Sequence, residues 1–272
     1  MRGEVVVSGE RPGSARMQTV DRALHALELF GALGPEISVT DSARELRVDR
    51  SIASRILATL EARGYVVQDA VTGRFRLGLR TVELGALYLQ GDRLVAAAMP
   101  YLQALGSPGD GTANLFVLHD GQAVRLASYP ARPMTGIRVP AHCTAAGKVL
   151  LASLPPGEIR AVLERHGLPP QTPRSITDRR ALYACLASVR EQGYGTDIEE
   201  RNLGRACVAA PVRDVTGRVV AAVSASWLAS RLTAERLPAL VDAVREAALA
   251  VSESLGTQPV ALQGIPVRSD AA

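Results

Sequence analysis

Hydrophobic residues in the first third of the chain recur at helical spacing in three blocks. The first block follows an aperiodic stretch and consists of Val20, Leu24, Leu27 and Phe30. Because these residues lie on one face of a helix, they predict an amphipathic helix that Gly31 and Gly34 end. A short second helix is expected to begin after Ser38 or Thr40 and to stop at Arg47.

The third block predicts a helix from Asp49, a candidate N-cap, to about Arg63. Its apolar face consists of Ala53, Ile56, Leu57 and Leu60, and the residues that point away from this face are Ser51, Ser54, Arg55 and Ala58. Two strand-like segments, 65–67 and 74–77, follow, joined by a turn that ends in Gly73. Three helices followed by a β-hairpin are the element order of a winged helix-turn-helix domain.

Beyond residue 78 the pattern changes to one helix followed by mixed helices and strands. Leu84 and Leu87 support a linker helix over residues 79–99. Asp120 and Gly121 separate two strand-like segments and have the composition of a tight hairpin turn. These strands are expected at 112–118 and 123–128, later strands at 206–212 and 218–227, and helices at 144–153, 157–166, 178–192 and 233–255.

Length and charge refine this picture. The chain has 272 residues, 47% of them hydrophobic, which is enough for two domains. Lys148 is the only lysine among 31 basic residues, and the net charge is +4. Eight arginines and five acidic residues lie between positions 41 and 80. The local excess of positive charge therefore surrounds the predicted third helix and hairpin, where an anionic partner is expected.

Cysteine usage and hydropathy indicate the compartment. Cys143, Cys185 and Cys207 are odd in number and widely spaced, which argues against a disulfide framework or a zinc site. The longest nearly apolar stretch, 219–229, is shorter than the ~20 residues of a membrane-spanning helix. We expect a cytoplasmic protein without a metal or a cofactor.

Several motifs occur together in a recognisable order. In the first half these are residues 19–24, 51–61, 63–66 and 72–78, and in the second half HCTAAGK at 142–148, ITD at 176–178 and CVAAPV at 207–212. In this order and spacing the chain resembles the isocitrate-lyase regulator (IclR) family of bacterial transcription factors. It departs from the pattern at Arg47, where such turns often hold glycine, and at Ile52, where a small polar residue is common.

The resemblance implies an α+β fold in four parts. After a disordered tail (1–17) come a winged helix-turn-helix domain (18–78), a linker helix (79–99) and a GAF-like α/β effector-binding domain (100–256), with a second disordered tail at 257–272. It also implies an effector-responsive regulator, a repressor or an activator, that binds a palindromic DNA operator. A homodimer or a dimer of dimers (a homotetramer) is expected.

Six residues are candidates for DNA contact: Arg50, Ser51, Ser54 and Arg55 on the third helix, and Arg74 and Arg76 on the wing. A helix fits the major groove, where guanidinium groups bind guanine or phosphate and serines allow close approach. Arg74 and Arg76 are two apart on a strand and share a side. The alternative is an ordinary solvated face.

The resemblance places effector contacts at Ala145, Ala146, Asp197, Cys207, Ser224 and Ser226. The resemblance implies an organic acid or an aromatic molecule as the effector, and the small residues at the predicted helix start expose N–H groups that suit an anion. Ser224 and Ser226 point the same way from one strand. Against this, Cys207 also fits a core position, the serines also suit backbone hydrogen bonds, and Asp197 also fits a surface acid or a helix cap.

Two other functions compete with regulation. An enzyme built on the second domain would use Cys207 or Ser224 as its nucleophile, but the sequence has no nucleophile elbow, phosphate-binding loop or dinucleotide fingerprint. A winged helix that binds another protein is the third possibility. We expect a regulator rather than an enzyme.

Overall fold

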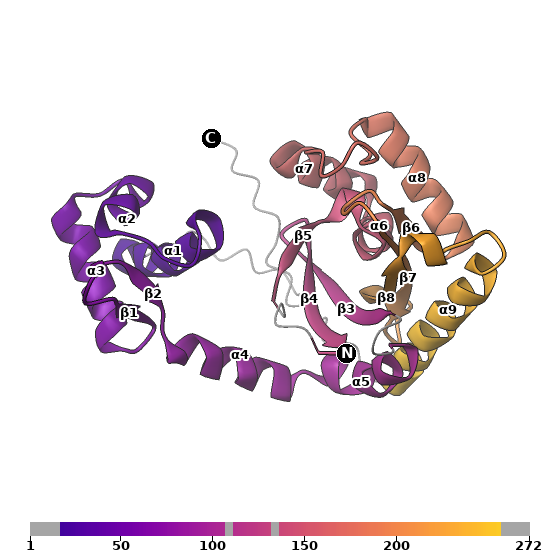
Figure 1. Cartoon of the computed structure of the whole chain (residues 1–272), viewed down its shortest axis with the longest axis horizontal. Coiled ribbons are helices and arrows are strands. Elements are labelled where there is room, and N and C mark those ends of the chain that lie inside the picture. The colour runs from indigo at the N-terminus through magenta and orange to yellow at the C-terminus, as the bar shows by residue number, and fades with distance from the viewer. Residues whose placement is uncertain (1–16, 107–110, 132–135, 257–272) are drawn as a thin grey trace, which may run out of the picture. The chain divides into compact units, whose positions relative to one another are not determined.

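The computed structural model describes residues 17–106, 111–131 and 136–256 of the chain. These residues form two compact units that divide between Tyr88 and Leu89 (Figure 1). The expected tails, 1–17 and 257–272, lie outside the described residues except for Met17.

The N-terminal unit is a three-helix domain with a two-stranded wing. Its elements are α1 (Gln18–Leu33), α2 (Val39–Leu46), α3 (Arg50–Ala62), β1 (Val66–Gln68) and β2 (Phe75–Leu77). The strands pair antiparallel, and an isolated bridge joins Ile37 to Phe75. A core around Phe30, Ile37 and Leu57 packs the helices against the wing. This order confirms the predicted winged helix-turn-helix.

The predicted apolar face of α1 is only half correct. Ala26, Leu29 and Phe30 are buried, whereas Val20 and Leu24 are 49% and 57% exposed. Periodicity identifies a hydrophobic stripe but does not say which part of it the same chain covers. The helix also continues through Gly31 and ends at Leu33.

The turn between α2 and α3 is set by its two ends. Ser38 caps α2 in a capping box, in which its hydroxyl accepts from the Asp41 N–H and the Asp41 carboxylate accepts from the Ser38 N–H. Arg47 ends α2 in the left-handed conformation, with φ 51° and ψ 51°. Asp49 precedes α3, as predicted, but its side chain makes no capping hydrogen bond.

The expected single linker helix over residues 79–99 is instead two helices, α4 (Leu79–Gly91) and α5 (Arg93–Leu105). The Asp92 carboxylate accepts hydrogen bonds from the N–H groups of Leu94 and Val95, so it caps a new helix. Leu94, Ala98 and Leu102 of α5 are buried in the core of the C-terminal unit. Helix α5 therefore belongs to that unit's core.

The C-terminal unit is built on one six-stranded antiparallel sheet in the order β5-β4-β3-β8-β7-β6 (Figure 1). The strands are β3 (Thr112–His119), β4 (Gln122–Tyr129), β5 (Arg138–Pro140), β6 (Gly195–Ile198), β7 (Arg205–Arg213) and β8 (Val219–Leu228). Asp120 and Gly121 both have positive φ, as the predicted hairpin turn requires. The sequence did not predict β5 and β6, which are too short to show a period.

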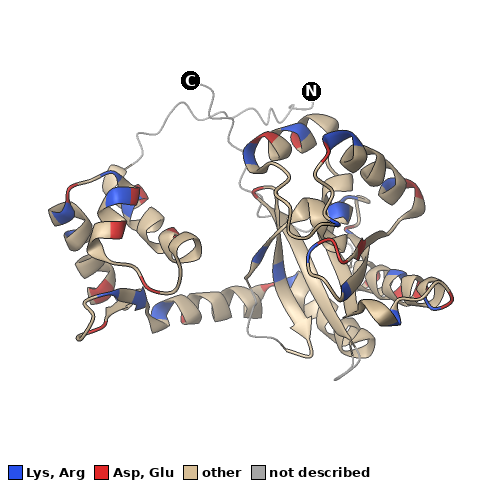
Figure 2. Cartoon of the chain, turned by 45° about the horizontal axis from the view of Figure 1, so that its top comes forward, with Lys and Arg blue, Asp and Glu red and all other residues tan. Residues whose placement is uncertain are grey.

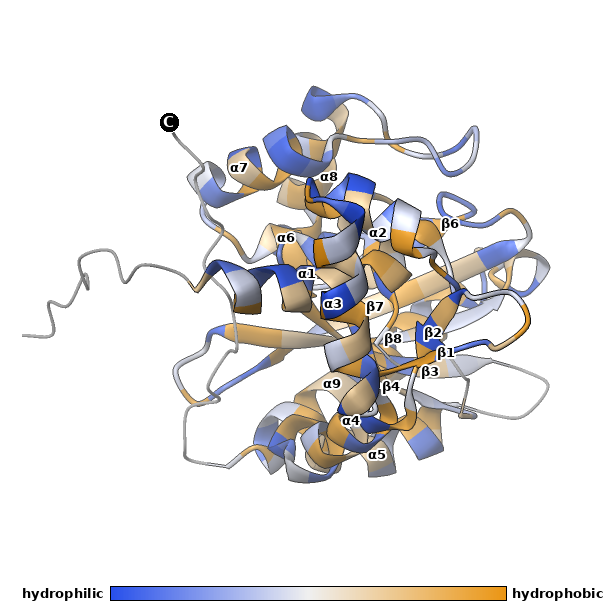
Figure 3. Ribbon diagram, turned by 90° about the vertical axis from the view of Figure 1, so that its left-hand side faces the viewer, coloured by the Kyte–Doolittle hydropathy of each residue, from blue (hydrophilic) through white to orange (hydrophobic). Residues whose placement is uncertain are grey.

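Helices cover both faces of this sheet. One core joins it to α5 and α9 (Leu237–Ser254), and the other joins it to α6 (Ala145–Ala152), α7 (Pro156–His166) and α8 (Arg179–Gln192). Short 3-10 turns, η1 (Ala141–Cys143) and η2 (Ala229–Arg231), complete the unit. Helix α6 is buried along its whole length, and hydrophilic turns appear on α7 and α8 (Figure 3). The face of the sheet that packs against α6 is therefore enclosed.

Among the described residues, none of the helices combines the length and the apolar character that crossing a membrane requires.

The left-handed conformation of Arg47 generates a stability prediction. A residue with a Cβ in this region costs about 1 kcal/mol, and glycine avoids that cost. We expect Arg47→Gly to raise the free energy of unfolding by up to about 1 kcal/mol in urea titrations. Arg63→Gly is the matched control, because Arg63 is an exposed arginine at the C-cap of α3 in the right-handed conformation. Equal effects of the two substitutions would contradict the prediction.

Candidate functional sites

Helix α3 separates its apolar and polar residues cleanly. Ala53, Ile56, Leu57 and Leu60 are buried as predicted. The candidate DNA contacts Arg50, Ser51, Ser54 and Arg55 are all exposed. The core of the domain thus fixes α3 by one side and leaves two guanidinium groups and two hydroxyls on the other. Such a surface suits the DNA major groove.

Basic residues on this unit alternate with acidic ones rather than forming a continuous stripe (Figure 2). The two arginines of the wing differ in whether an acidic residue engages them. Arg74 donates to the Glu36 carbonyl oxygen at 3.0 Å and lies 3.7 Å from the Asp41 carboxylate. Arg76, by contrast, is exposed. Arg74 therefore braces the wing against the start of α2, and Arg76 is the more accessible wing arginine.

The register of the sheet brings three predicted effector residues into one row. Asp197 of β6 is paired with Cys207 of β7, and Cys207 is paired with Ser226 of β8. Thr112 of β3 continues the row beside Ser226. Directly paired residues point to the same face of a sheet. Four polar or polarisable side chains from four strands therefore lie side by side.

A second polar row lies two residues further along the same face. Ser224 is paired with Asn114 of β3, and Asn114 is paired with Ser128 of β4. All three side chains are buried, although the surrounding strands are apolar. Buried polar groups are costly unless they find partners. The two rows together define a polar strip across an otherwise apolar sheet.

The start of α6 packs on this strip. Thr144 caps the helix, and its hydroxyl accepts from the Gly147 N–H at 3.2 Å. A Cβ at Gly195 would lie 2.9 Å from the Ala145 carbonyl oxygen, so the helix start touches β6 next to the rows. Ala145 and Ala146 belong to the core that includes Ala209, and Ala209 is paired with Ser224 at the β7 end of the second row. The structure therefore brings all six predicted effector residues to one face.

Burial dominates the electrostatics of Asp197. It raises the pKa of this carboxyl to about 6, while hydrogen bonds from the N–H groups of Glu200 and Arg201 oppose the shift. Burial also raises the pKa of the Cys207 thiol to about 12. At neutral pH the thiol is therefore protonated, and a protonated thiol is a poor nucleophile.

An ion pair beside the strip was missed in the sequence. The ammonium of Lys148 on α6 is 2% exposed and binds the Glu200 carboxylate in the loop after β6. Thr172 and Ser175 donate to the Glu200 carbonyl oxygen from a third segment. Because removing one partner of a buried pair leaves an uncompensated charge, this contact ties the loop firmly to α6. The lone lysine of the sequence was the available signal.

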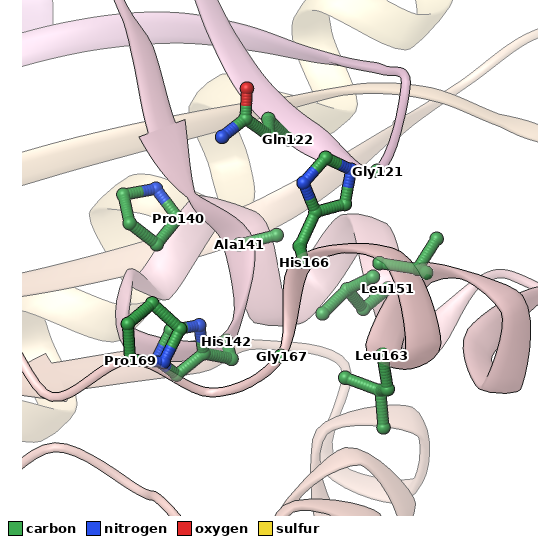
Figure 4. A pocket seen from close by; sticks show the side chains of 11 residues that line it. Gly121, Gln122, Pro140, Ala141, His142, Leu151, Leu163, His166, Gly167 and Pro169 are labelled. Atoms are coloured by element: carbon green, nitrogen blue, oxygen red, sulfur yellow. The ribbon is translucent and has the colours of Figure 1, made fainter.

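A pocket lies away from the strip, between the β4 and β5 ends, η1 and α7 (Figure 4). It has an empty volume of about 390 Å³, part of it open to solvent. His142 faces it, 4% exposed, and burial lowers the pKa of its imidazole. Its lining includes none of the predicted effector residues. In the described part of the chain, His, Cys, Asp and Glu side chains form no cluster that suits a metal ion.

The raised pKa of Asp197 predicts a pH dependence of stability. The folded value, about 6, exceeds the ordinary value of 3.8, so the folded state holds this proton more tightly. Stability is therefore expected to fall, by about 2–3 kcal/mol from this group, as pH rises from 4 through 6. Asp197→Asn keeps an acceptor for the two N–H groups and removes the charge. In urea unfolding at pH 5 and pH 8, the variant should be more stable than the wild type at pH 8, and by a larger margin than at pH 5. The same difference between variant and wild type at both pH values would contradict this.

Two family models match most of the chain. The model of the IclR helix-turn-helix domain matches residues 19–70, and that of the bacterial transcriptional regulator IclR C-terminal domain matches residues 86–253. The C-terminal match begins at residue 86, close to the division of the structure into two units between Tyr88 and Leu89.

Individual proteins agree over nearly their whole lengths. The chain is 35% identical to the HTH-type transcriptional regulator XynR of Escherichia coli (strain K12), covering 88% of this chain and 98% of that protein. It is 33% identical to the transcriptional repressor AllR of Klebsiella pneumoniae, covering 93% and 96%. A crystal structure of an IclR homolog from Microbacterium hydrocarbonoxydans, complexed with 4-hydroxybenzoate, is 26% identical, with a TM-score of 0.72 and coverage of 87% and 98%. The chain belongs to the IclR family of helix-turn-helix transcriptional regulators.

Proposed function

We propose that this regulator binds a two-fold symmetric operator as a dimer or a dimer of dimers and responds to a small organic molecule. The observation that carries the DNA-binding part is the two-sided helix α3, whose buried face fixes it and whose other face exposes Arg50, Ser51, Ser54 and Arg55. A single winged helix makes few phosphate contacts, so a useful affinity needs two copies on one site.

The effector part of the proposal is supported by the polar strip. Six side chains expected to contact an effector come from α6, β6, β7 and β8 and meet on one enclosed face. A related structure contains 4-hydroxybenzoate, which has an aromatic ring and a carboxylate. An organic acid or aromatic effector would favour one state of the regulator by a coupling free energy of about 1–3 kcal/mol.

Catalysis by the C-terminal unit has weaker support. The relatives with established names are transcriptional regulators. The Cys207 thiol, with its pKa of about 12, is not activated at neutral pH. Ser224 is paired with Ala209 and Asn114 across the sheet, and neither supplies a general base. We propose that the protein is not an enzyme and that it acts in the cytoplasm.

Helix α4 supports association of two copies. It has no buried residue, and Leu79, Val82, Leu84 and Leu87 are all exposed. Apolar side chains on more than one side of a helix indicate that another surface covers it. A second copy of this chain fits, because the operator-binding unit needs a partner. Val20 and Leu24 on α1 add exposed apolar surface to the same unit.

DNA binding is tested by band-shift titration with the DNA upstream of the protein's own gene. We expect Arg55→Gln to weaken binding at least tenfold and to reduce its salt dependence, because a charged contact to guanine or phosphate is lost. Arg63→Gln is the matched control, since it removes the same charge from the C-terminal end of α3 and is expected to change binding less than threefold. Absence of any sequence-specific shift, or equal losses in both variants, would overturn the proposal.

Dimer formation is tested by sedimentation velocity. Leu87→Glu places a charge on the exposed apolar surface of α4 and is expected to shift the protein toward monomer. Val71→Glu is the control, because Val71 is 94% exposed in the turn of the wing and is not on α4. A wild-type monomer, or a Leu87→Glu variant with the wild-type assembly state, would contradict a dimer through α4.

A further inference from the structure

Arg205, at the start of β7, was not among the predicted site residues, yet its guanidinium lies on the polar strip. Its Nη2 donates to the Ser226 hydroxyl at 2.9 Å and to the Ser226 carbonyl oxygen at 3.2 Å. Arg205 is two residues before Cys207, so both side chains leave the same face of the strand. A permanent positive charge therefore stands beside two of the expected effector contacts.

The loop before β7 holds Arg205 in place. The Arg205 carbonyl oxygen accepts from the Glu199 N–H at 2.8 Å, and the Arg205 N–H donates to the Asn202 carbonyl oxygen at 3.2 Å. The Glu199 carboxylate closes the loop by accepting from the Gly204 N–H at 2.8 Å. These bonds fix the Arg205 backbone, and the two bonds to Ser226 position its guanidinium before any ligand arrives, which reduces the entropy lost on binding.

Acidic groups near the strip do not cancel this charge. The carboxylate of Glu200 is paired with Lys148, and that of Glu199 is paired with Arg174. Asp197 pairs with Cys207, two residues along β7 from Arg205, but forms no ion pair with Arg205 among the described residues, and its Oδ1 accepts two backbone hydrogen bonds. A second guanidinium, that of Arg125 on β4, reaches Asn114 Oδ1 at 3.4 Å. The face therefore carries one arginine beside each polar row, Arg205 at Ser226 and Arg125 at Asn114.

The donors of Arg205 exceed what the protein uses. Its hydrogen bonds within the described residues involve Nη2, which leaves the N–H groups of Nε and Nη1 for another acceptor. A guanidinium in a partly buried position binds carboxylate strongly, because both partners are charged and the hydrogen bonds are directional. The Ser226 hydroxyl accepts from Nη2, and as a hydroxyl it still has one proton to donate.

We infer that Arg205 selects the effector by charge, so that the effector is an organic acid whose carboxylate binds the Arg205 guanidinium and the Ser226 hydroxyl. This inference rests on the proposed effector site and narrows its ligand from organic acids or aromatics to carboxylates. Neutral aromatic molecules of the same shape leave the guanidinium without an anionic partner, and they bind more weakly.

Isothermal titration of the full chain tests this with matched pairs of probes. The acids are glycolate, lactate and 4-hydroxybenzoate, and the neutral counterparts are glycolamide, lactamide and 4-hydroxybenzamide. At least one acid is expected to bind ten times more tightly than its amide. In Arg205→Gln this acid should lose at least tenfold in affinity while its amide changes less than twofold. Arg205→Lys, which keeps the charge, should recover part of the loss.

Arg213→Gln is the control for the variants, because it removes an arginine from the other end of β7, where Arg213 donates to the Gly217 carbonyl oxygen at 2.9 Å. It is expected to bind the acid like the wild type, and thermal melts check that every variant is folded. Failure of the wild type to bind any of the three acids, or equal affinity for acid and amide, overturns the inference. So does an Arg205→Gln variant that keeps its affinity for the acid.

The same samples separate this inference from the proposed function. If the preferred acid changes operator affinity in band shifts, both stand. If acids bind through Arg205 without changing operator affinity, the carboxylate site at Arg205 stands and the effector-responsive regulation fails. If amides bind as tightly as acids and change operator affinity, the regulation stands and the inference fails.

Discussion

The pairing of β7 with β8, and of β8 with β3, determines what the C-terminal unit presents to a ligand. In this register Asp197, Cys207 and Ser226 form one row, and Ser224 and Asn114 stand two residues further along the same face. A shift of one residue between strands would turn these polar groups toward the core that holds α5 and α9. The apolar residues on the opposite face, among them Val208 and Ala225, pack in that core and oppose the shift. Hydrophobic packing on one side of the sheet therefore secures polar chemistry on the other.

The N-terminal unit uses the same principle on a helix. Burial of Ala53, Ile56, Leu57 and Leu60 sets the rotation of α3, and this rotation decides which polar side chains face outward. The residues that we propose touch DNA therefore need not stabilise the domain. The wing differs, because Arg74 is engaged by Glu36 and Asp41 and so contributes to the domain's own structure. Charge that looks similar in the sequence thus has two different uses.

Sequence patterns predicted the long elements well, because a period repeated over several turns identifies a buried face. They did not predict helix boundaries, short strands or site residues that depend on a local hydrogen bond or on a contact with a distant segment. Asp92 ends one helix and caps the next through two hydrogen bonds, which no hydrophobic period reveals. The strand β6 has four residues, so the partner of Cys207 became visible only in the register. Arg205 was hidden for another reason: in a chain with so many arginines, composition does not distinguish the one that reaches Ser226.

The buried pair of Lys148 and Glu200 also determines how the protein behaves toward chemical reagents. Lys148 is the only lysine of the sequence, and its ammonium is enclosed and bound to a carboxylate. Amine-directed acylating reagents, which need an exposed and uncharged amine, therefore find no lysine side chain to modify on the folded protein. Labelling or surface attachment of the native protein has to use other groups, and reaction at Lys148 reports that the contact between α6 and the loop after β6 has opened.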